Sequence, residues 1–137
     1  MTTGTILQNS KLSLTIWFLA LYFIAQNKDG IYELSLAKYI GVTLNTAWAL
    51  LHKVRKAMSS RDSMYKLGGN IEMDEAFFGG NNEGKRGRGS LDNHYLQNYL
   101  DEFCYRFNRR NLETPVFDKL LKCCTTASYL RVSELCI

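Results

Sequence analysis

The feature that most constrains the fold is an uncharged stretch from Leu12 to Ala25. It falls short of the roughly 20 residues that a membrane-spanning helix needs. Lys11 is the only positive charge before it, and no small-residue cleavage site follows at signal-peptide spacing. Its apolar residues run nearly all round a helix, so the pattern predicts a helix over Lys11–Gln26 that is buried centrally, without a membrane partner.

Composition limits the chain to a single domain. It has 137 residues, of which 46% are hydrophobic, so a core is possible and wholesale disorder is excluded. The net charge of +4 is compatible with a polyanionic partner. The cysteines form no CxxC pair and have no histidine at ligand spacing, which argues against a zinc site and for reduced thiols in a cytoplasm. They are Cys104, Cys123, Cys124 and Cys136.

The segment after the apolar helix has the pattern of a helix-turn-helix. Ile31–Ile40 forms a short amphipathic helix in this interpretation, Gly41 supplies the turn, and Thr43 caps a second helix over Leu44–Met58. This is the layout of a major-groove reader, and a plain helical hairpin with a solvated outer face is the alternative. The candidate DNA contacts on the polar outer face are Asn45, Thr46, His52, Lys53 and Lys56. His52 has no metal-ligand partner at helical spacing, which indicates a surface or interfacial histidine.

An acidic segment over 71–80 is predicted to be a short strand. Glu72, Asp74 and Glu75 lie in an otherwise apolar run that ends in two glycines. A carboxylate in a half-buried strand costs free energy unless it is paired or holds a metal, whereas an edge strand with solvated acids is the alternative.

A glycine-rich cationic loop follows over 81–90. Its charges are Lys85, Arg86 and Arg88, which can contact phosphates without reading sequence. A solvated hairpin tip is the alternative. Leu91–Arg110 is then predicted to be a helix, and Val116–Cys124 a shorter one. The apolar stripe of the longer helix consists of Tyr95, Leu96, Tyr99, Leu100, Phe103 and Phe107.

Three groups of residues resemble a family of bacterial insertion-sequence transposases with an RNase-H-like core and an Asp-Asp-Asn or Asp-Asp-Glu metal site. The first is the strand Ile71-Glu72-Met73-Asp74-Glu75-Ala76-Phe77-Phe78-Gly79-Gly80. The second comprises Gly41-Val42-Thr43, Thr46-Ala47-Trp48 and Leu51-His52-Lys53-Val54-Arg55. The third consists of Leu96, Tyr99, Leu100, Glu102, Phe103, Tyr105 and Arg106 through Arg110. Ala49 departs from the family, which often has Arg or Lys there and so gains a phosphate or base contact.

The resemblance implies a function as well as a fold. Asp74 would be the first carboxylate binding Mg²⁺ for DNA strand cleavage and transfer. The partners would be DNA at the ends of the insertion sequence and, in addition, a second copy or an intact transposase. Thr3-Gly4-Thr5-Ile6 resembles the segment that follows a zinc ribbon in the family, so the ribbon is expected to be absent.

The sequence lacks the second and third metal ligands that catalysis in this family requires. Two-metal phosphoryl transfer needs at least three ligand side chains from separate elements. Asp92 is the nearest acid after the strand, and it lies at the start of the terminal helix. The residues between Gly80 and Leu91 are too few for the rest of a sheet. We therefore expect an internally deleted transposase that does not catalyse transfer and does not hold Mg²⁺ stably.

The expected fold is mainly α with a short β element, a helix-turn-helix bundle joined to the remnant of an α/β RNase-H-like core. Two alternatives to the transposase fragment remain: a non-catalytic helix-turn-helix protein acting on element ends, and a poorly folded non-functional remnant. The predicted parts are a flexible N-terminus (1–10), a helical DNA-binding region (11–58), a linker (59–70), the first strand and basic loop (71–90), terminal helices (91–124) and a tail (125–137).

Overall fold

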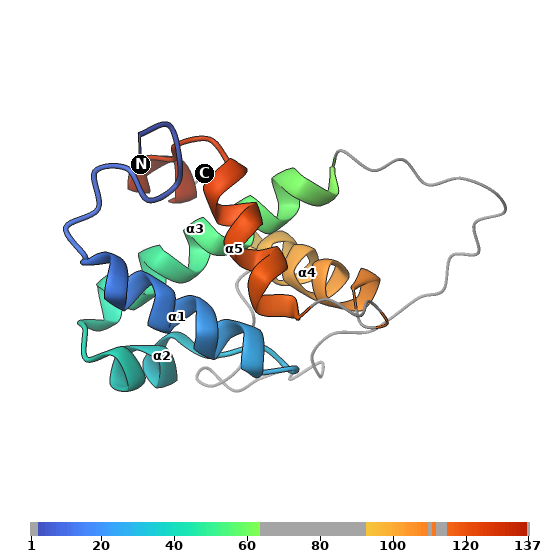
Figure 1. The fold of residues 1–137 in the computed structure, drawn as a ribbon, viewed down its shortest axis with the longest axis horizontal. Helices are drawn as coiled ribbons and strands as arrows, with labels where there is room; N and C mark the ends of the chain where they lie inside the picture. Colours follow the sequence, from blue (N-terminus) through green and yellow to red (C-terminus); the bar gives the residue numbers. More distant parts are fainter. Residues whose placement is uncertain (1–2, 64–92, 110, 112–114, 137) are drawn as a thin grey trace, which may run out of the picture.

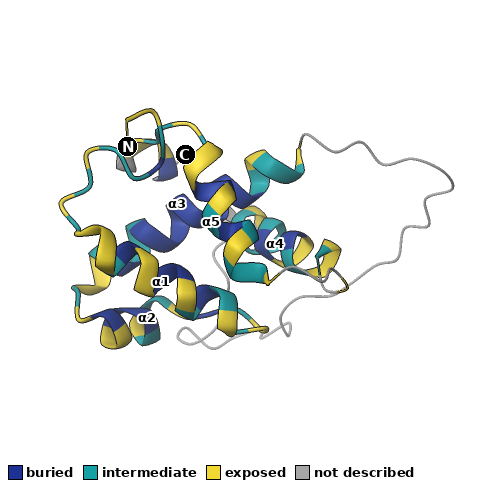
Figure 2. Cartoon of the chain, viewed as in Figure 1, coloured by how far each residue is buried: buried dark blue, intermediate teal, exposed yellow. Residues whose placement is uncertain are grey.

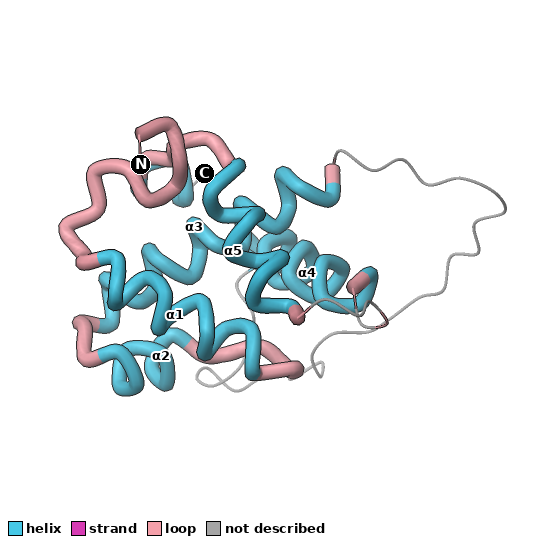
Figure 3. Tube along the Cα trace, viewed as in Figure 1, coloured by secondary structure: helices cyan, strands magenta, loops and turns pink. Residues whose placement is uncertain are grey.

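The computed structural model describes residues 3–63, 93–109, 111 and 115–136, and within these residues the chain is mainly helical (Figures 1 and 3). Its one β feature there is an isolated antiparallel bridge between Thr5 and Ser128. The predicted strand over 71–78 lies outside the described residues. The elements are α1 (Leu14–Gln26), α2 (Glu33–Ile40), α3 (Leu44–Asp62), α4 (Asn93–Asn108), α5 (Val116–Thr126) and the 3-10 helix η1 (Val132–Cys136).

The apolar first helix forms, but it starts at Leu14 and not at the predicted Lys11, and it is not buried on all sides. Ser13 caps α1 by accepting a hydrogen bond from the backbone N–H of Ile16 at 3.4 Å. One face packs inward against α2 and α5. The other faces solvent, as the exposed stretches of α1 in Figure 2 show. The buried residues are Trp17, Ala20, Leu21 and Ile24, and the exposed large ones are Leu14, Phe18, Leu19 and Tyr22.

Two helices joined by a short turn are present over α2 and α3, as predicted. Gly41 ends α2 in the left-handed conformation, with φ 68° and ψ 38°, and Val42 N–H donates to the Ala37 carbonyl at 3.1 Å. Thr43 then caps α3 by accepting from the N–H of Thr46 at 3.4 Å. The second helix runs past its predicted end at Met58 to Asp62, and so takes up the start of the expected linker.

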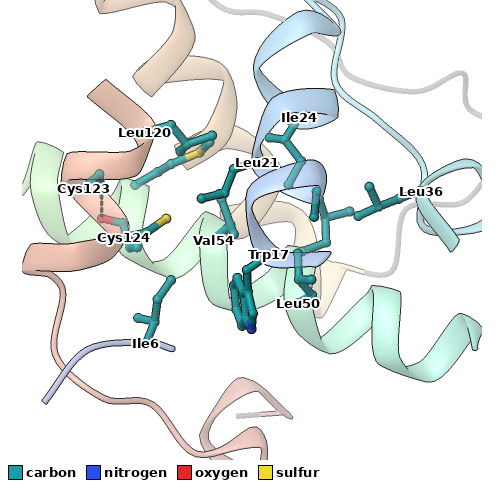
Figure 4. Close-up of a cluster of buried hydrophobic side chains, with 14 of the residues drawn as sticks. Ile6, Trp17, Leu21, Ile24, Leu36, Leu50, Val54, Leu120, Cys123 and Cys124 are labelled. Carbon is teal, nitrogen blue, oxygen red and sulfur yellow. Dashed lines mark hydrogen bonds between the residues drawn. The ribbon is translucent and has the colours of Figure 1, made fainter. Parts of the chain in front are cut away.

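Helix α3 is the central element, because α2, α4, α5 and η1 all pack on it. Figure 4 shows Leu50 and Val54 of α3 meeting residues of α1 and α5 in one cluster. Cys123 belongs to this cluster, and its Sγ donates to the Ala57 carbonyl at 3.1 Å. Cys104, Cys123 and Cys124 are free thiols, as predicted.

The two ends of the chain belong to the core, which corrects the prediction of a flexible N-terminus and a tail. Ile6 is fully buried, and Leu135 of η1 is buried as well. The bridge between Thr5 and Ser128 joins the two segments, which lie side by side in Figure 1. Ile6 and Leu135 explain this packing, because burying an apolar side chain is favourable even when the residues around it in the sequence are mostly polar.

Helix α4 forms where it was predicted, but its buried face is different. Glu102 and Tyr105 are buried, whereas Phe103 and Phe107 are half exposed and stack with ring centroids 5.9 Å apart. The predicted apolar stripe is therefore wrong at these two positions. Glu102 can be buried because it pairs with Arg55 of α3 and Arg106 of α4, so ion pairing as well as hydrophobicity decides which residues of this helix are buried.

Candidate nucleic-acid interface

Solvent reaches the predicted DNA-reading face at the first turn of α3 and again at Lys56. Asn45 is exposed and Thr46 is half-buried. Both border a cleft of about 400 Å³ between α3 and the N-terminal segment, which contributes Asn9, Ser10 and exposed Lys11. The Ser10 hydroxyl accepts from Trp17 Nε1 at 2.8 Å and so fixes this segment against α1. The cleft therefore presents amides, hydroxyls and a cation next to the start of the second helix.

Farther along α3, two residues of the predicted outer face, His52 and Lys53, are buried. Lys53 was expected to point outward, but it is buried, and its Nζ lies 5.8 Å from the centre of the Tyr129 ring in the C-terminal segment. Burial lowers the pKa of Lys53. Lys53 also lines the cleft, although only 8% of its surface is exposed.

His52 is also buried, which corrects its placement on the outer face. Only 1% of its surface is exposed, and its ring lies 4.3 Å from that of Trp48. Its Nδ1 is 3.2 Å from Asn98 Nδ2 of α4, which can only donate. Burial, with the nearby charge of Arg55, lowers the pKa of His52 to about 4. A neutral, enclosed imidazole cannot serve as a phosphate contact, so this histidine is interfacial.

The other predicted contacts divide into two groups. Lys56 is exposed on α3, as expected. Lys85, Arg86 and Arg88, together with the candidate metal ligand Asp74, lie outside the described residues. Within the described residues no group of three His, Cys, Asp or Glu side chains is placed to hold a metal ion. The structure brings Asn45, Thr46 and Lys53 together around one cleft. It does not test the predicted role of Asp74 as a metal ligand.

A buried ion network between α3 and α4 was not predicted. Arg55, 2% exposed, donates through Nε to Glu102 Oε2 at 2.7 Å and through Nη1 to Glu33 Oε1 at 3.2 Å. Arg106 donates to Glu102 Oε1 at 2.7 Å and to the Ile24 carbonyl at 2.7 Å. Tyr99 Oη donates to Glu33, and its ring lies 4.2 Å from the guanidinium carbon of Arg55. The network thus ties α1, α2, α3 and α4 together.

A second ion pair continues the same interface toward the end of α3. Arg109 Nη2 lies 2.7 Å from Asp62 Oδ1, and the guanidinium of Arg109 stacks 3.7 Å over the ring of Tyr105. Arg55, Glu102, Arg106 and Arg109 all belong to the motifs that carry the transposase resemblance. In this chain those motif residues hold helices together, which is a structural role.

Comparison of the chain with protein-family models, with curated proteins and with solved structures finds no match. The family assignment therefore has no support besides the motifs quoted above. Of the described helices, none is both long enough and apolar enough to span a membrane.

Proposed function

We propose that this chain binds DNA through the first turn of α3, as a helix-turn-helix protein of insertion-sequence transposase descent that does not catalyse strand transfer. The observation that carries the proposal is the α2–Gly41–α3 unit with exposed Asn45 at the start of its second helix. Helix-turn-helix proteins contact base edges with the N-terminal residues of that helix. The proposal places the protein with bacterial DNA in the cytoplasm.

The geometry limits what such a reader can contact. Its polar groups near the groove-reading end are Asn45, Lys11 and Thr46, and the Thr46 hydroxyl is already hydrogen-bonded to that of Thr43 at 2.8 Å. The middle of α3 is packed against α4 and η1. An asparagine can pair with adenine through two hydrogen bonds, and a lysine contributes a phosphate contact. Binding supported by so few contacts is expected to be weak and strongly dependent on salt.

The binding experiment compares two exposed lysines. Fluorescence anisotropy of a labelled element-end duplex is measured against the full chain from 50 to 300 mM salt. Lys11→Ala is expected to weaken binding and to reduce the salt slope by about 0.9, the value for one lost phosphate contact. Lys28→Ala is the matched control, because Lys28 is also exposed but follows the far end of α1, about 20 Å away at 1.5 Å per residue.

Two results would contradict DNA binding through this surface. One is no binding at 50 mM salt, and the other is an equal effect of Lys11→Ala and Lys28→Ala. Asn45→Ala should in addition reduce the preference for the element end over a scrambled duplex, since base contacts specify and phosphate contacts position.

The absence of catalysis is a separate proposal, supported by the sequence, which supplies Asp74 without the later ligands of the family. Full-length protein with Mg²⁺ and an element-end substrate is expected to produce no cleaved or joined strands. Strand transfer that disappears in Asp74→Ala would overturn this part of the proposal and leave the DNA-binding part intact.

A further inference from the structure

The solvent-facing side of α1 is an apolar surface that the proposed DNA binding does not use. We define the α1 face as Leu14, Phe18, Leu19 and Tyr22 of α1 with Tyr39 of α2, which are 48%, 44%, 41%, 48% and 56% exposed. Phe23 links the two helices, because it stacks on Tyr39 with ring centroids 4.9 Å apart and meets Tyr22 edge-on at 5.7 Å. The five side chains thus lie over neighbouring helices.

No residue of α1 is charged. Its sequence is LTIWFLALYFIAQ, so the arc that carries the exposed side chains contains only the neutral polar residues Thr15 and Gln26 besides the apolar ones. The chain as a whole has a net charge of +4. A stretch of this length without charge on the outside of a cationic protein is the region where two copies can approach without like-charge repulsion.

The size of the face suits the apolar centre of a small interface. An aromatic side chain contributes roughly 150–250 Å² when fully buried, so half-exposed Phe18, Tyr22 and Tyr39 offer about 220–370 Å², to which Leu14 and Leu19 add. A standard interface covers about 800 Å² on each partner, with an apolar centre and a polar rim. The α1 face can supply that centre, and exposed Lys38 and Asp118 on the adjacent helices can supply part of the rim.

We propose that the α1 face docks on the same face of a second copy of this chain, giving a twofold-symmetric dimer. A twofold interface must be complementary to itself, which an uncharged apolar face satisfies. The uncharged α1 face is not suited to DNA, because a protein binds DNA largely through cationic side chains that contact the phosphates. A lipid surface is the other occupant that the test must separate from a second copy, because α1 itself carries no Lys or Arg but exposed Lys11 and Lys28 lie just beyond its two ends.

The test measures the mass of the full chain in the absence of DNA, so its outcome is independent of the proposed DNA binding. Sedimentation equilibrium from 1 to 100 μM is expected to give twice the 15.7 kDa chain mass at the upper end. Phe18→Ser is expected to raise the dissociation constant by about tenfold, as loss of a central aromatic does. Serine and phenylalanine have similar helix propensities, and the buried side of α1 is unchanged.

Tyr32→Ser is the matched control. Tyr32 is 79% exposed and lines a different cleft, with Arg55, Tyr99 and Phe103. It is the N-cap of α2, where serine is favoured, so the helix is retained. Circular dichroism of both variants establishes that they are folded, and Tyr32→Ser should dimerise like the wild type.

Four outcomes overturn the dimer. They are a monomer at 100 μM, an equal loss of association in the two variants, assemblies that continue to grow beyond two copies, and a dimer that Phe18→Ser leaves unchanged. Cosedimentation with zwitterionic or anionic phospholipid vesicles that Phe18→Ser abolishes would also overturn it, because a lipid surface would then be the occupant.

Discussion

Neutralising Glu102 tests whether the α3–α4 network holds the fold together. Glu102 is 4% exposed and binds two guanidinium groups, Arg55 at 2.7 Å and Arg106 at 2.7 Å. Glu102→Gln keeps the side-chain volume and removes the charge. Arg55 and Arg106 then share one enclosed region, and Glu33 remains as the carboxylate that contacts Arg55.

The expected loss is about 3 kcal/mol in the free energy of unfolding. Removing one partner of a buried ion pair costs roughly 3–5 kcal/mol, because the remaining charge stays desolvated. The glutamine oxygen still accepts one hydrogen bond, so the expected loss of stability lies at the lower end of this range. Small domains unfold with about 5–15 kcal/mol in total, so this loss is a large fraction of the stability.

Urea unfolding followed by circular dichroism at pH 7 measures the effect. Asp101→Asn is the control, since it makes the same chemical change at the neighbouring residue, whose carboxylate accepts from exposed Gln97 at 2.8 Å. It should cost less than about 0.5 kcal/mol. A loss below about 1 kcal/mol for Glu102→Gln, or equal losses in the two variants, would refute the structural role of the network.

The same variant has a defined pH dependence. Burial acts to raise the pKa of Glu102, but the charges and hydrogen bonds of Arg55 and Arg106 outweigh it, and the pKa is lowered from the ordinary value of 4.5. A carboxylate with a lowered folded-state pKa stabilises the protein above its unfolded pKa and loses that contribution as the pH falls through the folded value. The difference between wild type and Glu102→Gln should therefore narrow below about pH 4.5.

Three further predictions concern other parts of the fold. The pKa of His52 is lowered to about 4, so as the pH falls its imidazole is protonated in the unfolded chain before it is protonated in the folded protein. The free energy of unfolding should therefore fall by about 2 kcal/mol between pH 7 and 4.5. A urea midpoint that stays constant over this range would contradict this prediction. Gly41→Ala should cost about 1 kcal/mol, because φ is +68° although an added Cβ meets no atom within 4 Å; its urea midpoint at pH 7 tests this, and an unchanged midpoint would be unexpected. Cys104 is exposed, whereas burial raises the pKa of Cys123 to about 11, so mass spectrometry after iodoacetamide labelling at pH 7.5 should show Cys104 modified at least about tenfold faster; equal rates would mean that the helix carrying Cys123 opens readily.

The helices could be predicted because their signals are local. Gly41 and Thr43 act at their own positions as a left-handed turn residue and a cap, as predicted, whereas the cap at Ser13 was not predicted. Helix ends were less predictable, as the extension of α3 to Asp62 shows, since tertiary contacts with α4 decide where fraying stops.

The exposure of each helix face could not be predicted from periodicity alone. His52 and Lys53 have the spacing of a polar outer face, but whether that face meets solvent depends on α4 and on the chain ends, which pack from distant positions in the sequence. Arg55 and Glu102 are separated by 47 residues. The spacing of Glu102 and Arg106 was visible as an i,i+4 pair, but an isolated pair of that kind is typical of a solvated helix surface.

An internal deletion that removed a sheet would expose the apolar surface of the 91–110 helix that the sheet once covered. Bare apolar surface is found at Phe103 and Phe107, whereas Tyr105 and Glu102 are covered by α3. Two motifs that resemble distant parts of a transposase therefore pack directly on each other through Arg55, Glu102 and Arg106. That contact requires no sheet, so α3 and the elements packed on it, α2, α4, α5 and η1, can form one folded unit.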